Sequence, residues 1–347
     1  MNPRTVPPAT SGRNLIDSTF GFQPVAASVL EVVEALPCNV FLLRSGRPVL
    51  FATRGAEAAD VVARTRRDVA FYVRTEDTEL MRRSLSRSVP RILSDPELSP
   101  VERSRRAYGV VAHVMTPIFS PRQRIDQAGL DDAGWAIDSI KDSLGVDSDL
   151  IWSFVATMNK HLSTHTHAIN TAVYAVLIAD ALGITGEEGR DIGRGALLHD
   201  IGKNRIPPAI LDKPGPLDEA EWTLMRSHPR VGYDLIVRAM GSAPSYAHII
   251  AEHHERADGS GYPLQRLAGE VAQSSQLVSI ADAYDALTSA RSYKPASSSY
   301  GALWTMRFRM RGQFDGLLLA AFVDMLGGWG QLRRVERRTL DLSATGS

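Results

Sequence analysis

The sequence predicts a mainly helical protein, in which a helical domain follows a small α/β domain, and the order of its local patterns carries this prediction. Val40–Leu43 and Val49–Phe51 are short apolar runs, and residues 44–48 (RSGRP) between them give the signal of a β-hairpin. Residues 56–67 have the composition of a helix, and residues 69–73 (VAFYV) are rich in β-branched and aromatic side chains, as in a third strand. Beyond this strand the patterns become helical.

Capping signals mark where several of the later helices begin. Ser99, Thr185 and Asp218 are each followed three residues later by a glutamate, which is the capping-box pattern, and Pro100 suits the first position of a helix. Apolar spacing then predicts helices over residues 100–118, 129–144, 150–162 and 164–182, with shorter helices to about residue 326. We therefore expect a loose tail over residues 1–20, an α/β regulatory domain with a helical connector over residues 21–125, and a helical catalytic domain over residues 126–335.

The composition is that of a soluble globular protein, with 44% hydrophobic and 22% charged residues. Lys plus Arg equals Asp plus Glu, so the formal net charge is zero and a nucleic acid polymer is not an expected partner. No apolar run approaches the roughly 20 residues that a membrane span requires. The lone cysteine, Cys38, excludes an internal disulfide and fits a cytoplasmic location, and we expect it to be a buried structural thiol.

Histidines and aspartates concentrate on apolar helices of the second domain. His199-Asp200 ends one such helix, and His253-His254 precedes a glycine-rich loop. A single histidine on an apolar helix is usually a satisfied core residue, but burying adjacent pairs of such groups without partners or a cation costs several kcal/mol each. The candidate metal ligands are His167, His199, Asp200, His228, His253, His254 and Asp282.

These candidate ligands suit two divalent transition metals. Imidazole and carboxylate ligands fit iron, manganese, zinc or nickel, and the lack of thiolates argues against a closed structural zinc site. Two octahedral ions have roughly twelve coordination positions. If Asp200 bridges both ions, the side chains fill about eight positions, and the others serve water and phosphate oxygens, as a hydrolytic two-metal site requires.

The order of these motifs resembles that of the HD-GYP subfamily of the HD phosphohydrolases. The matching elements lie between Thr164 and Phe322, nearly half of the chain. They are His199–Lys203 (HDIGK), His228-Pro229, His253–Glu255 (HHE), Asp258–Pro263 (DGSGYP) and Asp282–Thr288 (DAYDALT). The resemblance implies an all-helical domain with a bi- or trinuclear iron or manganese centre. It also implies hydrolysis of the bacterial second messenger cyclic di-GMP to linear pGpG or, after a second cut, to GMP.

Carried over residue by residue, the resemblance assigns roles to the side chains around the metal ligands. Lys203 and Asp200 are the expected catalytic residues, and Lys203 is expected to reach the scissile phosphate or to help protonate the leaving oxygen. The alternative interpretation of Lys203 is a solvated lysine near the end of a helix, where its charge complements the helix dipole. The expected substrate contacts are Arg291, Lys294, Asp285 and Tyr262.

One position departs from the family pattern. Members with three metals carry a glutamate four residues before the first histidine of the motif, and Ser163 occupies that position here. Serine is a poor ligand for these ions, so we expect two metals rather than three, with pGpG as the main product. Nearby His161 and His165 are expected to lie at the surface or behind the ligands.

Several alternatives stay open from the sequence. The substrate could be another cyclic dinucleotide or linear pGpG, and the chain could instead be a cyclic di-GMP sensor that barely turns its ligand over. A GGDEF protein or another signalling protein could bind the Gly261-Tyr262-Pro263 loop, and the chain could form a homodimer. The N-terminal domain has no clear phosphoacceptor pattern of a receiver domain, which leaves its input signal open.

Overall fold

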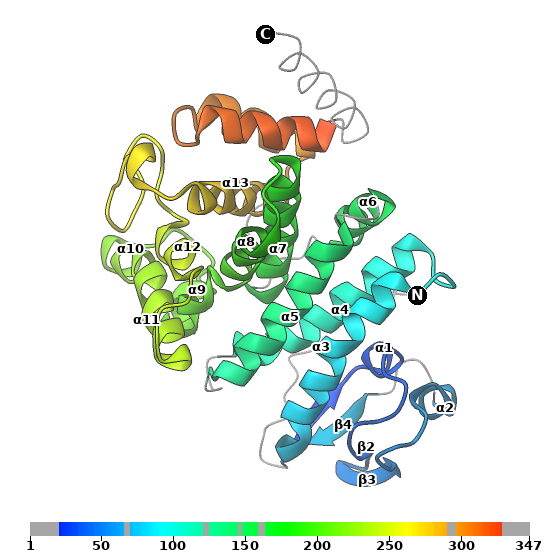
Figure 1. Cartoon of the computed structure of the whole chain (residues 1–347). Coiled ribbons are helices and arrows are strands. Elements are labelled where there is room, and N and C mark those ends of the chain that lie inside the picture. The colour runs from blue at the N-terminus through cyan, green and yellow to red at the C-terminus, as the bar shows by residue number, and fades with distance from the viewer. Residues whose placement is uncertain are drawn as a thin grey trace, which may run out of the picture. The chain divides into compact units, whose positions relative to one another are not determined.

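The computed structural model describes residues 21–65, 70–120, 125–144, 148–158, 164–289 and 296–327 (Figure 1). Contacts between Cα atoms divide the chain between Met81 and Arg82 into an N-terminal unit and a larger helical unit. The helices expected as a connector belong to the second unit by these contacts, whereas the domain limits at residues 125 and 335 remain predictions.

The N-terminal unit contains a four-stranded antiparallel sheet in the order β1-β4-β2-β3. The predicted hairpin is β2 (Val40–Arg44) and β3 (Arg47–Ala52), which pair from Arg44 opposite Arg47 to Val40 opposite Ala52. Its turn is shorter than expected, because Ser45 and Gly46 alone reverse the chain, with φ of 50° and 75°. Positive φ at both central residues matches the twist of a two-residue hairpin. The predicted third strand is β4 (Phe71–Arg74).

Strand β1 (Phe22–Val25) lies at one edge of this sheet, beside β4, and the sequence did not predict it. It contains Pro24, which cannot donate a backbone hydrogen bond and is therefore tolerated at a sheet edge but not in a central strand. A short helix, α1 (Ala27–Leu30), follows it, and α2 (Ala58–Ala63) occupies part of the predicted range 56–67.

Cys38 is 3% exposed, as expected for a structural thiol. Burial, with a further contribution from the carboxylate of Asp77, raises the pKa of Cys38 to about 11. The thiol therefore stays neutral and unreactive at about pH 8. We expect a thiol reagent to leave the folded protein unmodified and to modify one thiol per chain after denaturation. Rapid modification of the folded protein would contradict this assignment.

The helical unit begins within α3 (Thr78–Ser94) and continues with α4 (Pro100–Ile118), α5 (Gln127–Leu144) and α6 (Ser148–Thr157). The predicted cap of α4 is confirmed, because the hydroxyl of Ser99 accepts a hydrogen bond from the backbone N–H of Glu102. Helix α4 packs against α5, α6 and α7 (Thr164–Ala181). The predicted helices of this region are therefore present, with small shifts at their ends.

Helix α7 is the centre of the helical unit and also contacts α8 (Gly186–Leu198) and α13 (Gln273–Thr288). All of its residues from Thr166 to Ala179 are buried, so it is enclosed on every side rather than along one stripe. The other elements are η3 (Ile201–Arg205), α9 (Pro208–Leu211), α10 (Glu219–Arg226), α11 (His228–Met240), α12 (Ala247–Glu252), η4 (Ala268–Glu270), α14 (Ser299–Trp304), η5 (Thr305–Arg309) and helical residues 316–327.

The other two predicted capping boxes have different outcomes. Asp218 and Glu221 form the complete box at the start of α10. Thr185 precedes α8, but its side chain makes no capping hydrogen bond. Gly186 directly after it has a φ of 63°, so the chain enters α8 with a geometry that does not bring the hydroxyl onto the first turn.

Among the described residues, no helix is both long enough and apolar enough to cross a bilayer.

Candidate metal centre

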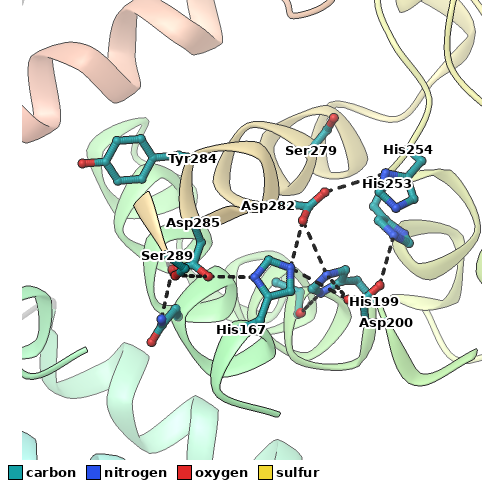
Figure 2. A network of polar contacts seen from close by, with 12 residues as sticks. His167, His199, Asp200, His253, His254, Ser279, Asp282, Tyr284, Asp285 and Ser289 are labelled. Atoms are coloured by element: carbon teal, nitrogen blue, oxygen red, sulfur yellow. Dashed lines mark hydrogen bonds and ion pairs between the residues drawn. The ribbon is translucent and has the colours of Figure 1, made fainter. Parts of the chain in front are cut away.

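The predicted ligands come together in the interior of the helical unit, and Figure 2 labels all of them except His228. They come from α7, the turn after α8, the start of α11, the turn after α12, and α13. They form two groups whose ligand atoms lie within 4.8 Å of one another, namely Asp200, His228, His253 and His254 in one, and His167, His199 and Asp282 in the other.

Asp200 lies between the two groups. Its Oδ2 is 3.4 Å from Nε2 of His199 and 3.8 Å from Nε2 of His167. Its Oδ1 is 3.2 Å from Nε2 of His228 and 3.9 Å from Nε2 of His253. One carboxylate oxygen thus faces each group, which is the arrangement that a bridging carboxylate requires.

Backbone carbonyls fix the orientation of three ligand rings. In each of them Nδ1 lies close to the carbonyl oxygen three residues earlier, at 2.7 Å in His199, 2.7 Å in His228 and 2.9 Å in His253. A carbonyl only accepts, so Nδ1 carries the proton and Nε2 of the neutral ring presents its lone pair to the centre. Nε2 of His228 and Nε2 of His253 are 3.3 Å apart, which brings two lone pairs together.

The residues present fit a pair of divalent transition metals. Nε2 of His199 and Oδ1 of Asp200 are buried and have no hydrogen-bond partner, although leaving such atoms unpaired is costly. A cation between the facing lone pairs would satisfy both. The donor set of five imidazoles and two carboxylates suits transition metals such as iron, manganese, zinc or nickel.

The charges of the cluster also suit metal ligation. Burial lowers the pKa of His253 and His254 well below its usual range, and neighbouring histidines add to this effect, so both rings are neutral. Burial raises the pKa of Asp200, but neighbouring groups, first the charge of Lys203, outweigh it and hold that pKa well below the usual range. Neutral imidazoles and ionised carboxylates are the forms that bind metals.

Lys203 lies at the rim of the cluster. Its Nζ donates to Oδ2 of Asp200 at 2.6 Å, and its side chain is 24% exposed. The preceding Gly202 packs so closely on α11 that a Cβ atom there would overlap the carbonyl of His228. Only glycine allows this approach, which fixes the turn that carries Lys203 against the segment that carries His228.

Tyr262 stacks on His254, with ring centroids 4.6 Å apart and planes 30° apart. Its loop is held by the buried carboxylate of Glu255, which accepts from the backbone N–H of Leu264 at 2.7 Å and of Arg266 at 3.0 Å. The structure thus gives Tyr262 a packing contact with one ligand, and its predicted contact with substrate remains a prediction.

We expect Glu255→Gln to reduce the free energy of unfolding by about 2 kcal/mol, because an amide NH2 would face one of two backbone donors that need an acceptor. Glu270→Gln is the matched control, since Glu270 is exposed and accepts from Leu267 in the same loop. Urea unfolding measures both changes. Equal stability of the two variants would contradict the role given to Glu255.

Asp285 contacts a predicted ligand. It is 2% exposed, and its Oδ2 lies 2.7 Å from Nδ1 of His167, on the ring edge that faces away from Asp282 (Figure 2). This position lets Asp285 support His167, and its predicted contact with substrate remains a prediction. Sequence reasoning also missed Asn170, whose side-chain amide donates to Oδ1 of Asp285 at 2.9 Å. The only local signal was its spacing, three residues after His167 on the same helix.

A cavity of about 140 Å³ adjoins this supporting side rather than the ligands themselves. Asn170, Asp285 and Ser289 line it, together with residues 296–299. The predicted substrate contacts Arg291 and Lys294 fall outside the described residues, as do Ser163 and His161. His165 is described, is half-buried, and belongs to neither ligand group.

Comparisons with known proteins agree with this site. Residues 149–318 match the family model described as HD domain. The chain is 40% identical over 163 residues to the cyclic di-GMP phosphodiesterase response regulator RpfG of Xanthomonas campestris, covering 46% of this chain and 42% of the relative. It is 36% identical over 163 residues to the 3'3'-cGAMP-specific phosphodiesterase 3 of Vibrio cholerae, covering 47% of this chain and 35% of the relative. The chain therefore spans less than half the length of these curated relatives.

A solved structure has a similar fold over most of the chain. It is Bd1817, an HDG"Y"P protein from Bdellovibrio bacteriovorus, with a TM-score of 0.65 and 17% identity over 88% of this chain and 100% of that one. The HD domain that residues 149–318 match is the class that the sequence motifs indicate. The mainly helical fold with a small N-terminal sheet is likewise as predicted.

Proposed function

We propose that this chain is a metal-dependent phosphodiesterase that opens cyclic di-GMP to linear pGpG. The observation that carries the proposal is the position of Asp200, with one oxygen toward each of two groups of inward-facing imidazoles. Two divalent metals held by these groups would activate water and neutralise charge on the phosphoryl oxygens.

The protein's own residues supply the rest of the chemistry. Backbone carbonyls hold the ligand rings in one tautomer, and Asp200 stays ionised between the two groups. Lys203 is partly exposed beside Asp200, so its ammonium group can approach a phosphate oxygen or give a proton to the leaving 3'-oxygen. Opening one phosphodiester bond in this way consumes one water and leaves a 5'-phosphate and a 3'-hydroxyl.

The metals proposed are iron or manganese, and the count proposed is two per chain. The seven ligands in two groups support this count, and Ser163 offers no carboxylate for a third ion. Elemental analysis of protein purified without chelator should show about two equivalents of a transition metal. If Ser163→Glu raises this number to three, the position four residues before His167 is the missing ligand site.

The substrate class is supported by the relatives, which are named for cyclic di-GMP and for 3'3'-cGAMP. Both are cyclic dinucleotides with the same phosphodiester ring, so 3'3'-cGAMP is the second candidate substrate. A contact to the purine that differs between guanine and adenine must decide between them, and none of the described ligands provides it.

A panel assay tests the proposal. Purified protein loaded with manganese or iron is incubated with cyclic di-GMP, 3'3'-cGAMP and pGpG, and products are separated by chromatography. We expect the highest kcat/KM with cyclic di-GMP and accumulation of pGpG, and no product after chelation. Faster turnover of 3'3'-cGAMP would assign the second candidate. Binding of cyclic di-GMP without turnover of any substrate would assign a sensor instead.

Arg291 and Lys294 remain the proposed phosphate contacts. We expect the Arg291→Ala, Lys294→Ala double variant to bind cyclic di-GMP about a hundredfold more weakly or worse, because it loses two charge-assisted contacts that contribute about 1.5–3 kcal/mol each. Its metal content should not change. The Arg307→Ala, Arg309→Ala variant removes two exposed charges of the same sign and is the control. Equal affinity of the two variants in calorimetry would refute the placement.

Partner binding and dimerisation also remain proposals. Pro263, in the Gly261–Pro263 loop, and Leu264, directly after it, are exposed, and Leu264 has a relative exposure of 62%. This exposure supports a contact with a GGDEF or other signalling protein at the loop. The same surface is available to a second copy of this chain.

A further inference from the structure

His167 is held differently from three of the other four ligand histidines. His199, His228 and His253 are oriented by carbonyls of their own helical turns, three residues earlier. Nδ1 of His167 is instead held by Asp285, 118 residues later in the chain, at 2.7 Å. The orientation of this ring therefore depends on a tertiary contact and not on its local backbone.

Asp285 is held in turn by α7. Its Oδ1 accepts from Nδ2 of Asn170 at 2.9 Å, and its Oδ2 also accepts from the hydroxyl of Ser289 at 3.3 Å. Oδ1 of Asn170 accepts from the hydroxyl of Tyr108 at 2.9 Å. All of these groups are buried. The contacts therefore form one continuous path from Tyr108 to His167.

The direction of every hydrogen bond in this path is determined. An ionised carboxylate only accepts, so Asn170 must turn its NH2 group and His167 its Nδ1–H toward Asp285. The carbonyl oxygen of Asn170 then faces Tyr108, which must donate. The path thus fixes the tautomer of His167 with Nε2 toward the ligands, as the carbonyls do for the other rings.

Tyr108 belongs to α4, which lies outside residues 149–318 that match the HD domain. We propose that Tyr108, Asn170 and Asp285 are positioning residues for the metal centre, and that α4 sets the affinity of the His167 metal site through them. This inference rests on the proposed metal-dependent function. A displacement of α4 would change metal affinity without any change in the ligands themselves.

Metal titration tests the inference without substrate. Chelator-treated protein is titrated with Mn²⁺, and free Mn²⁺ is measured by electron paramagnetic resonance. Because supporting residues typically contribute about 10–100-fold to metal affinity, we expect Asp285→Asn to weaken the weaker of the two sites by about that factor. Tyr108→Phe removes one neutral hydrogen bond, worth about 1 kcal/mol, and should weaken the same site about fivefold.

A double variant separates positioning from general destabilisation. If Tyr108 acts through Asp285, Tyr108→Phe should cause no further loss of Mn²⁺ affinity in the Asp285→Asn background. Tyr246→Phe is the control, since Tyr246 is 6% exposed against 7% for Tyr108 and lies at the start of α12. It should bind Mn²⁺ as the wild type does.

The contradicting outcomes are specific. Wild-type Mn²⁺ affinity in Tyr108→Phe, or an equal fold-loss in both backgrounds, overturns the inference even if the enzyme is active. An inactive wild type whose Mn²⁺ affinity still falls in these variants refutes the proposed function and leaves the inference standing. Should Asp285→Asn fail to fold, as shown by its melting curve, Tyr108→Phe compared with Tyr246→Phe decides the question.

Discussion

Asp200→Ala should remove most of the bound metal and lower the rate of cyclic di-GMP hydrolysis by on the order of a thousandfold or more, since loss of even one preorganised electrostatic contact costs about 10²–10³. The reason is its place between the two ligand groups, with Oδ2 3.4 Å from His199 and Oδ1 3.2 Å from His228. Alanine removes an oxygen from each group and the negative charge that both share.

Elemental analysis and a steady-state assay on the same preparation measure this prediction. Asp138→Asn is the matched control, because Asp138 is also a largely buried carboxylate but pairs with Arg194 on α8. It should lose stability and keep its metals. If Asp200→Ala retains two metals per chain, Asp200 does not bridge and the two-group geometry has another cause.

Lys203→Ala should keep its metals and lose about a hundredfold in kcat. Its Nζ lies 2.6 Å from Asp200, at the exposed rim of the cluster, where the charge that develops on a phosphate oxygen would be closest. A cation that acts mainly in the transition state changes kcat more than KM. Substrate saturation curves and metal analysis therefore separate catalysis from binding.

Lys213→Ala is the control for this variant, since Lys213 also pairs with a carboxylate, Glu221, and is of similar exposure. Its kcat should equal that of the wild type. A rise in KM without a fall in kcat for Lys203→Ala would make Lys203 a binding residue. Loss of metal would show instead that its charge is needed to keep Asp200 in place.

The ligands were predictable from sequence because several are adjacent in the chain or lie on helices that are apolar enough to be buried. His199-Asp200 and His253-His254 follow α8 and α12 directly, and each of these helices delivers its polar pair to the interior. Asp282 lies in the buried part of α13, among apolar residues, where an ionisable group would not stabilise the core. Polar residues that interrupt an apolar pattern were the informative signal.

The supporting residues could not be predicted in the same way. Asp285 contacts His167 across 118 residues, and Tyr108 contacts Asn170 across 62. Nothing in the local pattern of α4 distinguishes Tyr108 from an ordinary core tyrosine, because its role depends on which helix α4 packs against. The motif that contains Asp285 names a residue type but not the direction in which its side chain points, so its contact with His167 was not predicted.

The fold shows the same limit. Apolar spacing located α4, α5 and α7, because the pattern that predicts a helix lies within one short segment of the chain. Edge strand β1 was missed because its pairing with β4 is non-local and it contains a proline. The cap at Thr185 was wrong because one glycine with positive φ changed the entry into α8.

The most direct test measures metal occupancy and hydrolysis in the same samples. Chelator-treated wild-type protein is titrated with Mn²⁺, and bound metal is determined together with the pGpG formed from cyclic di-GMP. We expect no hydrolysis without metal, and a rate that rises until about two ions are bound per chain and then stays constant. Hydrolysis that persists in the chelated protein, or two bound ions with no hydrolysis of any cyclic dinucleotide, would contradict a two-metal phosphodiesterase.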